Sequence, residues 1–121
     1  MIERCFDYRR IKRIVGRDVC ISSDVIHLVE TDGKEDLGVW TLHDYKDGLL
    51  IHANLTKCAG KKAKKSAQDS FEWVFSNTDF NKIYASIPNR KRHAQVMAIA
   101  SGMNFEYKGD NYRHYKIENS R

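Results

Sequence analysis

"LLIHANLTKCAGKKAKKSAQDSFEWVF", residues 49–75, changes its hydrophobic period halfway along and thereby decides the fold. Residues 49–55 are an apolar run of the length and type found in buried strands. From Ala63 to Phe75 the apolar residues recur every three or four positions, which predicts a helix of about four turns. The centre of the chain is therefore a strand that passes through a short loop, with Gly60 at the turn, into an amphipathic helix.

The patterns on either side place this strand and helix inside a larger sheet. The expected elements are an edge strand at 1–8, a short helix at 9–16, strands at 26–31, 37–45 and 49–55, a helix ending at Asn77, a strand at 82–87, a helix at 90–101 and a hairpin at 104–118. One strand–helix–strand unit within a mostly antiparallel sheet predicts a mixed α/β fold. We expect a single domain over residues 1–121, which is an ordinary domain length.

The composition limits the class of partner. Lysine and arginine exceed aspartate and glutamate by 21 − 16 = 5, which favours anionic partners such as a phosphate-bearing cofactor, nucleic acid or an acidic acceptor. No apolar run approaches the roughly 20 residues of a membrane helix, and the first residues carry charge unlike a signal peptide. The three cysteines lack a CxxC spacing, and the histidines show no metal-ligand spacing. We therefore expect a cytoplasmic protein without a membrane segment or a metal.

The most concentrated positive charge stands at the start of the central helix. Its four lysines are Lys61, Lys62, Lys64 and Lys65. A helix N-terminus is already the positive end of the peptide dipole, and each cation there costs about 0.3–1 kcal/mol. The cluster is therefore a solvated turn, a phosphate-binding site or a nonspecific contact for nucleic acid.

Three stretches together resemble the GNAT superfamily of N-acetyltransferases. They are residues 49–75, "KIYASIPNRKRHAQVMAIASGM" at 82–103 and the hairpin "NFEYKGDNYRHYKIE" at 104–118. In the family, a strand leads through a loop of pattern Gln/Arg-x-x-Gly-x-Gly/Ala into a helix, and the loop amides hold the pyrophosphate of acetyl-CoA. The resemblance implies a GNAT-like sheet flanked by helices, acetyl-CoA as a substrate, and transfer of its acetyl group to an amine of an unidentified acceptor.

The resemblance also implies site residues. Those expected to bind acetyl-CoA are Leu55, Lys57, Gly60, Lys61, Lys62, Ala63, Lys64, Lys65 and Asn89. His52 is expected to take the proton of the amine, with Asn54 as the second polar residue of its strand. Backbone N–H groups near residues 53–55 are expected to polarise the thioester carbonyl.

Two positions depart from the family pattern and keep alternatives open. Lys62 stands where the loop has glycine or alanine, and Ala98 stands where many members have a tyrosine that protonates the departing thiolate. The chain also resembles degenerate GNAT-like accessory proteins of tailed phages, some associated with the virion. The alternatives are thus a GNAT-fold interaction protein that has lost catalysis, binding protein or nucleic acid through its basic face, and a small DNA-binding protein. His52 could equally be an ordinary hydrogen-bonded strand residue.

Overall fold

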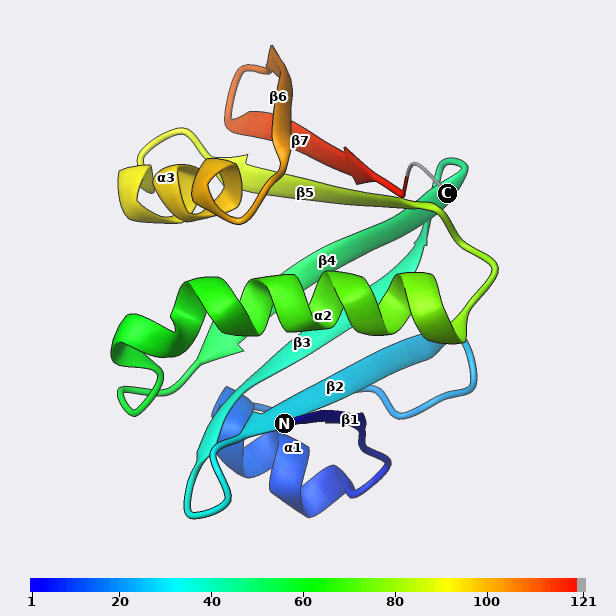
Figure 1. Ribbon diagram of the computed structural model, residues 1–121, viewed down its shortest axis with the longest axis vertical. Coiled ribbons are helices and arrows are strands. Elements are labelled where there is room, and N and C mark those ends of the chain that lie inside the picture. Colours follow the sequence, from blue (N-terminus) through cyan, green and yellow to red (C-terminus); the bar gives the residue numbers. More distant parts are fainter. Residues whose placement is uncertain (120–121) are drawn as a thin grey trace.

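Within residues 1–119, which the computed structural model describes, seven strands form one sheet (Figure 1). Their order across the sheet is β1-β2-β3-β4-β5-β7-β6. The strands are β1 (Ile2–Arg4), β2 (Val25–Thr31), β3 (Asp36–Tyr45), β4 (Gly48–Leu55), β5 (Lys82–Pro88), β6 (Asn104–Lys108) and β7 (Tyr112–Glu118). The helices are α1 (Tyr8–Val15), the single 3-10 turn η1 (Gly60–Lys62), α2 (Ala63–Asn77) and α3 (Arg92–Ala100).

The β4–β5 pair at the centre of the sheet is parallel, whereas every other neighbouring pair is antiparallel. The two strands pair only at Leu49 with Ile83 and at Leu50 with Tyr84. Gly48 brings β4 against β5 at this end, because a Cβ there would meet the carbonyl group of Lys82. Beyond these pairs the strands separate, which leaves the second half of β4 without a hydrogen-bonded neighbour on that side.

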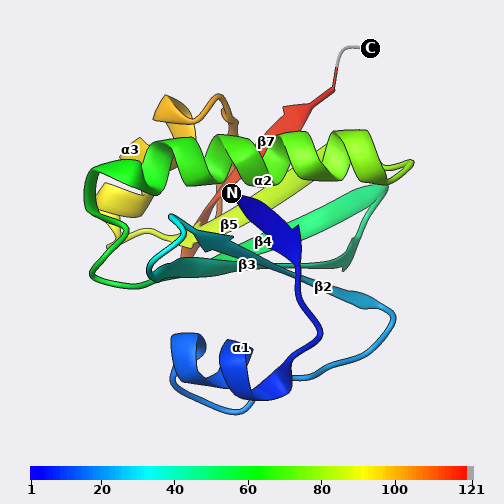
Figure 2. The same ribbon diagram turned by 60° about the horizontal axis from the view of Figure 1, so that its bottom comes forward.

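Helix α2 covers one face of the sheet, as Figure 2 shows. Its buried residues pack on a core built from alternate residues of β2 to β5, and Leu28, Leu42 and Ile83 are fully buried there. Trp40 of β3 donates its indole N–H to the hydroxyl of Ser66 at 2.8 Å, both side chains being buried. This bond joins the sheet to the second turn of α2 and fixes where that helix begins.

Helix α1 lies against the opposite face of the sheet (Figure 2). Asp7 caps its N-terminus by accepting from the N–H groups of the second and third residues that follow, and Gly16 ends it with a φ of 83°. Ile11 is fully buried against Val29 and Val39. The α1–β2 loop, residues 16–24, is thereby held close to the central strands.

The expected order of elements and the mixed α/β fold class are confirmed, with local differences at the first strand and at helix starts. The edge strand expected at 1–8 is shorter, because Asp7 already caps α1. The helix expected from Lys61 begins as the 3-10 turn η1, and α2 proper starts at Ala63. The helix expected from Arg90 starts two residues later, because the turn after β5 is closed by the N–H of Lys91 donating to the carbonyl of Pro88 at 2.9 Å. None of the helices in residues 1–119 is long and apolar enough to cross a membrane.

Candidate active site

A cleft opens where β4 and β5 separate. It encloses about 380 Å³, which is within the range of small-molecule sites. Residues 51–55 of β4 form one wall and residues 85–88 of β5 the other. The lining also includes Arg17, Trp40, Ala67, Phe71, Lys91, Ala94, Met97, Ala98, Ser101 and Met103. The site is therefore formed by tertiary packing of segments from most of the chain.

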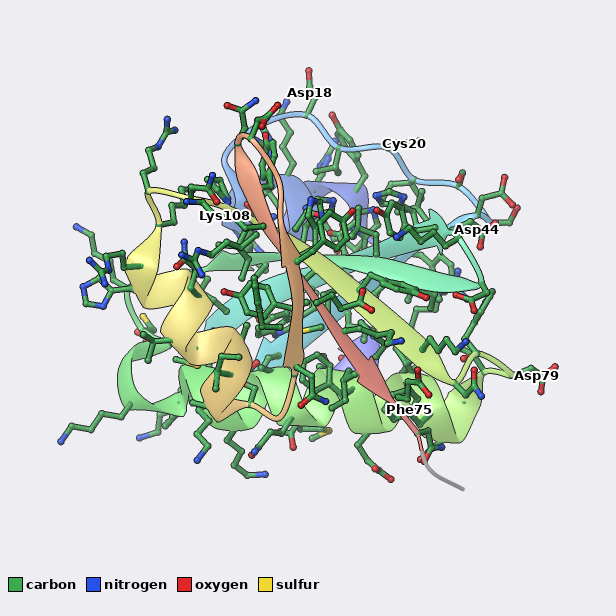
Figure 3. The ribbon with its side chains drawn as sticks, turned by 90° about the horizontal axis from the view of Figure 1, so that it is seen from above. Asp18, Cys20, Asp44, Phe75, Asp79 and Lys108 are labelled. Atoms are coloured by element: carbon green, nitrogen blue, oxygen red, sulfur yellow. The ribbon has the colours of Figure 1, made fainter. Side chains whose placement is uncertain are left out.

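The cleft passes through the sheet from one face to the other. Ala67 and Phe71 line it from α2, and Ala98 lines it from α3. Arg17 lines it from the α1–β2 loop, on the opposite face. Figure 3 shows this arrangement, with the loop that carries the labelled Asp18 on one side of the sheet and α2 on the other. Two ligands can thus approach the same reacting point from opposite faces.

The backbone of β4 presents polar groups to this cleft. Thr56 donates its N–H to the carbonyl of Leu37, so these two residues are a hydrogen-bonded pair of the β3–β4 ladder. Bonded positions alternate in an antiparallel pair, so the N–H and C=O groups of Ala53 and Leu55 point away from β3. Because β5 no longer pairs with β4 at this level, these groups face the cleft.

His52 lines the cleft on the α1 face of the sheet. Its neighbour Ile51 belongs to the core beneath α2, and successive strand residues face opposite sides. The Nε2 atoms of His52 and His43 are 3.3 Å apart, and the two rings stack with an interplanar angle of 17°. Partial removal from water, with the neighbouring His43 and Arg17, lowers the pKa of His52. Its imidazole is therefore mostly neutral near pH 7 and able to accept a proton.

Asn54 and Leu55 also line the cleft, next to His52 on the same strand. Asn54 is half-buried, and its side chain makes no hydrogen bond to another residue of 1–119. By strand alternation it faces the same side as His52. The structure therefore brings together His52, Asn54 and Leu55 of the residues expected from the sequence.

The lysine-bearing loop lies at one end of the cleft. Leu55 before the loop and Ala67 after it both line the cavity, so the intervening turn is at its rim. Gly60 has a φ of 43°, a left-handed conformation that glycine adopts easily. Neither η1 nor α2 has a side-chain cap or an acidic residue in its first turn. The N–H groups of Lys62 and Ala63 already donate to the carbonyls of Ala59 and Gly60 within this turn. The N–H groups of Gly60 and Lys61 have no acceptor in residues 1–119 and are the ones left for an anion.

The four lysines of this turn are all exposed, but they are not equivalent. Lys62 forms an ion pair with Asp32 of the β2–β3 turn at 3.2 Å. The backbone N–H groups of Glu35 and Lys34, and after them this lysine, lower the pKa of Asp32 to about 2. Lys65 forms an ion pair with Asp69, one turn along α2, at 3.1 Å. The two lysines without a carboxylate partner in residues 1–119 are Lys61 and Lys64.

Lys57 and Asn89 lie outside the cleft lining. Lys57 is exposed at the start of the loop. Asn89 follows β5, where its side-chain amide donates to the carbonyls of Gly109 at 3.3 Å and Asp110 at 3.1 Å. Its position therefore ties the β5–α3 turn to the β6–β7 hairpin.

Sequence reasoning missed several cleft residues. Arg17, Ser86 and Ser101 all line the cavity. Ser86 faces the α1 side of β5, where its hydroxyl is 3.0 Å from Nδ1 of His114 on β7. Strand alternation could have placed Ser86 on that face, but no sequence pattern connects Arg17 with β4.

Ala98 lines the cleft as a small buried side chain and offers no hydroxyl there. The two hydroxyls among the lining residues of 1–119 are those of Ser86 and Ser101. Ser101 donates its hydroxyl to the carbonyl of Met97 at 2.7 Å. In the same described part of the chain, no three His, Cys, Asp or Glu side chains are grouped so that they could hold a metal ion.

Solved structures share this fold. The N-acetyltransferase PseH of Campylobacter jejuni, in complex with acetyl coenzyme A, superposes with a TM-score of 0.73 over 82% of this chain and 71% of that chain, at 8% identity. The chain has the GNAT fold. Spermidine N-acetyltransferase SpeG of Vibrio cholerae gives a TM-score of 0.77 over 98% of this chain and 92% of that chain, at 11% identity.

An acetyltransferase of the GNAT family from Bacillus anthracis gives a TM-score of 0.64 at 14% identity, over 93% of this chain and 83% of that chain. Comparison with known sequence families gives no match, and comparison with curated proteins gives none either. At such low identities the likeness establishes the GNAT fold alone. The fold expected from the three sequence stretches is thereby confirmed.

Proposed function

We propose that this protein is an acetyl-CoA-dependent N-acetyltransferase that transfers the acetyl group to a primary amine. The observation that carries the proposal is the cleft between β4 and β5, with the backbone groups of Ala53 and Leu55 facing it. The cleft ends at a helix N-terminus without a cap. A thioester arm fits between the strands, and its phosphates fit the helix end. The PseH structure, which contains acetyl coenzyme A, supports the same use of this fold.

The phosphate end of the site is strongly basic. Lys61 and Lys64 are free to contact phosphates, and the basic run 90–92 begins α3 at the same end of the molecule (Figure 1). Lys62, at the position where the family has a small residue, is paired with Asp32. This ion pair draws the long side chain of Lys62 toward the β2–β3 turn and leaves the backbone of the loop accessible. The positive charge of these lysines then attracts the phosphates of acetyl-CoA and compensates for the missing small residue of the loop.

The chemistry we assign to the cleft is direct attack of a neutral amine on the thioester carbonyl. Bound acetyl-CoA supplies the acyl group and a thiolate leaving group. The N–H groups of Ala53 and Leu55 donate to the carbonyl oxygen, where negative charge develops. His52 accepts the proton of the amine, directly or through one water. Because the side chain of Ala98 has no ionisable proton, we assign protonation of the departing thiolate to solvent water.

Calorimetric titration with acetyl-CoA tests the first part of this proposal. We expect micromolar binding, and release of the CoA thiol when an acceptor amine is added. The variant with Lys61, Lys62, Lys64 and Lys65 all changed to alanine should bind more weakly, with an unchanged circular dichroism spectrum. Absence of binding at millimolar acetyl-CoA would contradict the proposal.

A second candidate function is a GNAT-fold interaction protein without catalysis. Ala98 in place of the family's tyrosine and the basic end of the molecule favour it. Its binding to nucleic acid would fall steeply with salt concentration. The test is titration with a DNA duplex at two salt concentrations. Binding that falls with salt, in a preparation that fails to bind acetyl-CoA, would support this alternative. The association with phages and virions remains a prediction.

A further inference from the structure

Arg17 is an exposed cation at the cleft, and its side chain has no partner within residues 1–119. It follows Gly16, which ends α1, and it lines the cavity on the α1 face of the sheet. No carboxylate or hydrogen-bond acceptor in residues 1–119 contacts its side chain. Its loop is tied to α1 by the hydroxyl of Tyr8, which donates to Asp18 at 2.7 Å, and to β2 by Nε2 of His27, which lies 2.8 Å from the carbonyl oxygen of Cys20. The fold therefore places at the mouth of the cleft a guanidinium that no described residue pairs with.

The charged lining of the cleft is entirely cationic. Arg17 and Lys91 are its charged side chains, and no aspartate or glutamate belongs to the described lining. The nearest carboxylate along the chain, Asp18, is already occupied. It accepts the hydroxyl of Tyr8 at 2.7 Å and pairs with Lys12 at 3.0 Å. No charge in the lining therefore compensates Arg17.

The two cations lie on opposite sides of the sheet. Lys91 precedes α3, on the side of α2 and of the basic phosphate end. Arg17 lies on the side of α1, with His52 and Asn54. An acetyl donor bound from the α2 side leaves the α1 side for the acceptor. Arg17 is therefore the charged side chain that meets the acceptor.

We propose that the acceptor is a primary amine on a molecule that also carries a carboxylate or phosphate, which Arg17 binds while His52 receives the amine. This inference rests on the proposed acetyltransferase function. The guanidinium fork matches the planar geometry of a carboxylate and the oxygens of a phosphate. The cationic lining repels a polycation more strongly than an amine whose positive charge is balanced by a carboxylate or phosphate on the same molecule. Polyamines, such as the spermidine in the name of SpeG, are therefore poor acceptors here.

Pairs of acceptors that differ in charge test this inference. Glucosamine 6-phosphate is compared with glucosamine, aspartate with asparagine, and spermidine serves as the polycation. Initial rates of CoA release are measured for the natural chain and for Arg17→Ala, Arg17→Lys and Arg9→Ala. Arg9 is an exposed arginine of α1 outside the cleft, so its variant controls for loss of one positive charge. Acetyl-CoA affinity is measured for each chain by calorimetry.

We expect the anionic member of at least one pair to have the higher kcat/KM by tenfold or more. Arg17→Ala should raise its KM at least tenfold, Arg17→Lys should restore part of the preference, and Arg9→Ala should leave the preference unchanged. The pair of acceptors that shows the preference tells whether the anionic group of the acceptor is a phosphate or a carboxylate. NMR titration of the His52 and Asn54 signals with inorganic phosphate or aspartate should show shifts that Arg17→Ala abolishes.

The inference is overturned by preferred acetylation of spermidine, by an unchanged preference in Arg17→Ala, or by acetyl-CoA binding without transfer to any anionic amine. In each of these outcomes the acetyl-CoA site itself still stands. Failure to bind acetyl-CoA would instead overturn the proposed function and this inference together.

Discussion

The four lysines at the start of α2 should contribute unequally to acetyl-CoA affinity. Lys61 and Lys64 have no carboxylate partner in residues 1–119, whereas Lys62 and Lys65 are paired with Asp32 and Asp69. A charge pair at about 4 Å is worth about 1 kcal/mol in water and about 4 kcal/mol near a protein surface. We take about 1 kcal/mol for each exposed lysine that meets a phosphate. Changing both unpaired lysines to alanine should then raise the Kd about 30-fold.

The matched comparison is the double variant Lys62→Ala/Lys65→Ala, which removes the same charge from the same turn. These two lysines already neutralise carboxylates, so they attract a phosphate less and their loss should raise the Kd only about threefold.

Calorimetry at 50 mM and 500 mM NaCl gives the Kd of each double variant for acetyl-CoA. The difference between the two Kd values should shrink at the higher salt concentration. Circular dichroism and thermal melting confirm that both variants fold. Equal losses in the two double variants, or no loss in Lys61→Ala/Lys64→Ala, would refute the assignment of these lysines to phosphate binding.

Two further predictions concern the packing and the titration of the site. Ser66→Ala should lower stability by about 1–3 kcal/mol, because it leaves the buried indole N–H of Trp40 without an acceptor. In thermal melting this is a drop in Tm of about 4–12 °C. The control is Ser70→Ala, which should lower the Tm clearly less, because the hydroxyl of Ser70 donates only to a carbonyl of its own helix. Equal drops in the two variants would contradict the role of the indole bond. His43→Ala should raise the pKa of His52, because a neighbour that disfavours its protonated form is removed. NMR titration of the His52 imidazole measures this pKa directly. The acid limb of the pH profile of kcat/KM should move to higher pH. An unchanged or lowered pKa of His52 would count against the coupling of the two histidines.

Local patterns in the sequence were sufficient for the elements and the fold class. The change of period between residues 49–55 and 63–75 distinguished a strand from a helix, since each buries one face with its own repeat. Gly60 marked the turn between them, and the structure gives it a left-handed conformation. His52, Asn54 and Leu55 could be predicted as cleft residues because they are neighbours in the chain and their order alone places them at the end of a strand.

The other half of the cleft was decided only by the tertiary structure. Arg17 meets β4 because α1 packs on the sheet through a buried Ile11, and no periodicity shows that contact. The same applies to Asp32, whose pairing with Lys62 spans a turn and a helix far apart in sequence. The charges in a sequence indicate the sign of the charge on a partner. Which groups each charge pairs with depends on the distances between side chains, and those distances are set by the folded structure. The sequence by itself thus determined a basic strand–loop–helix unit. Only the folded chain decided that Asp32 of the β2–β3 turn pairs with Lys62 and that α1 brings Arg17 to the cleft.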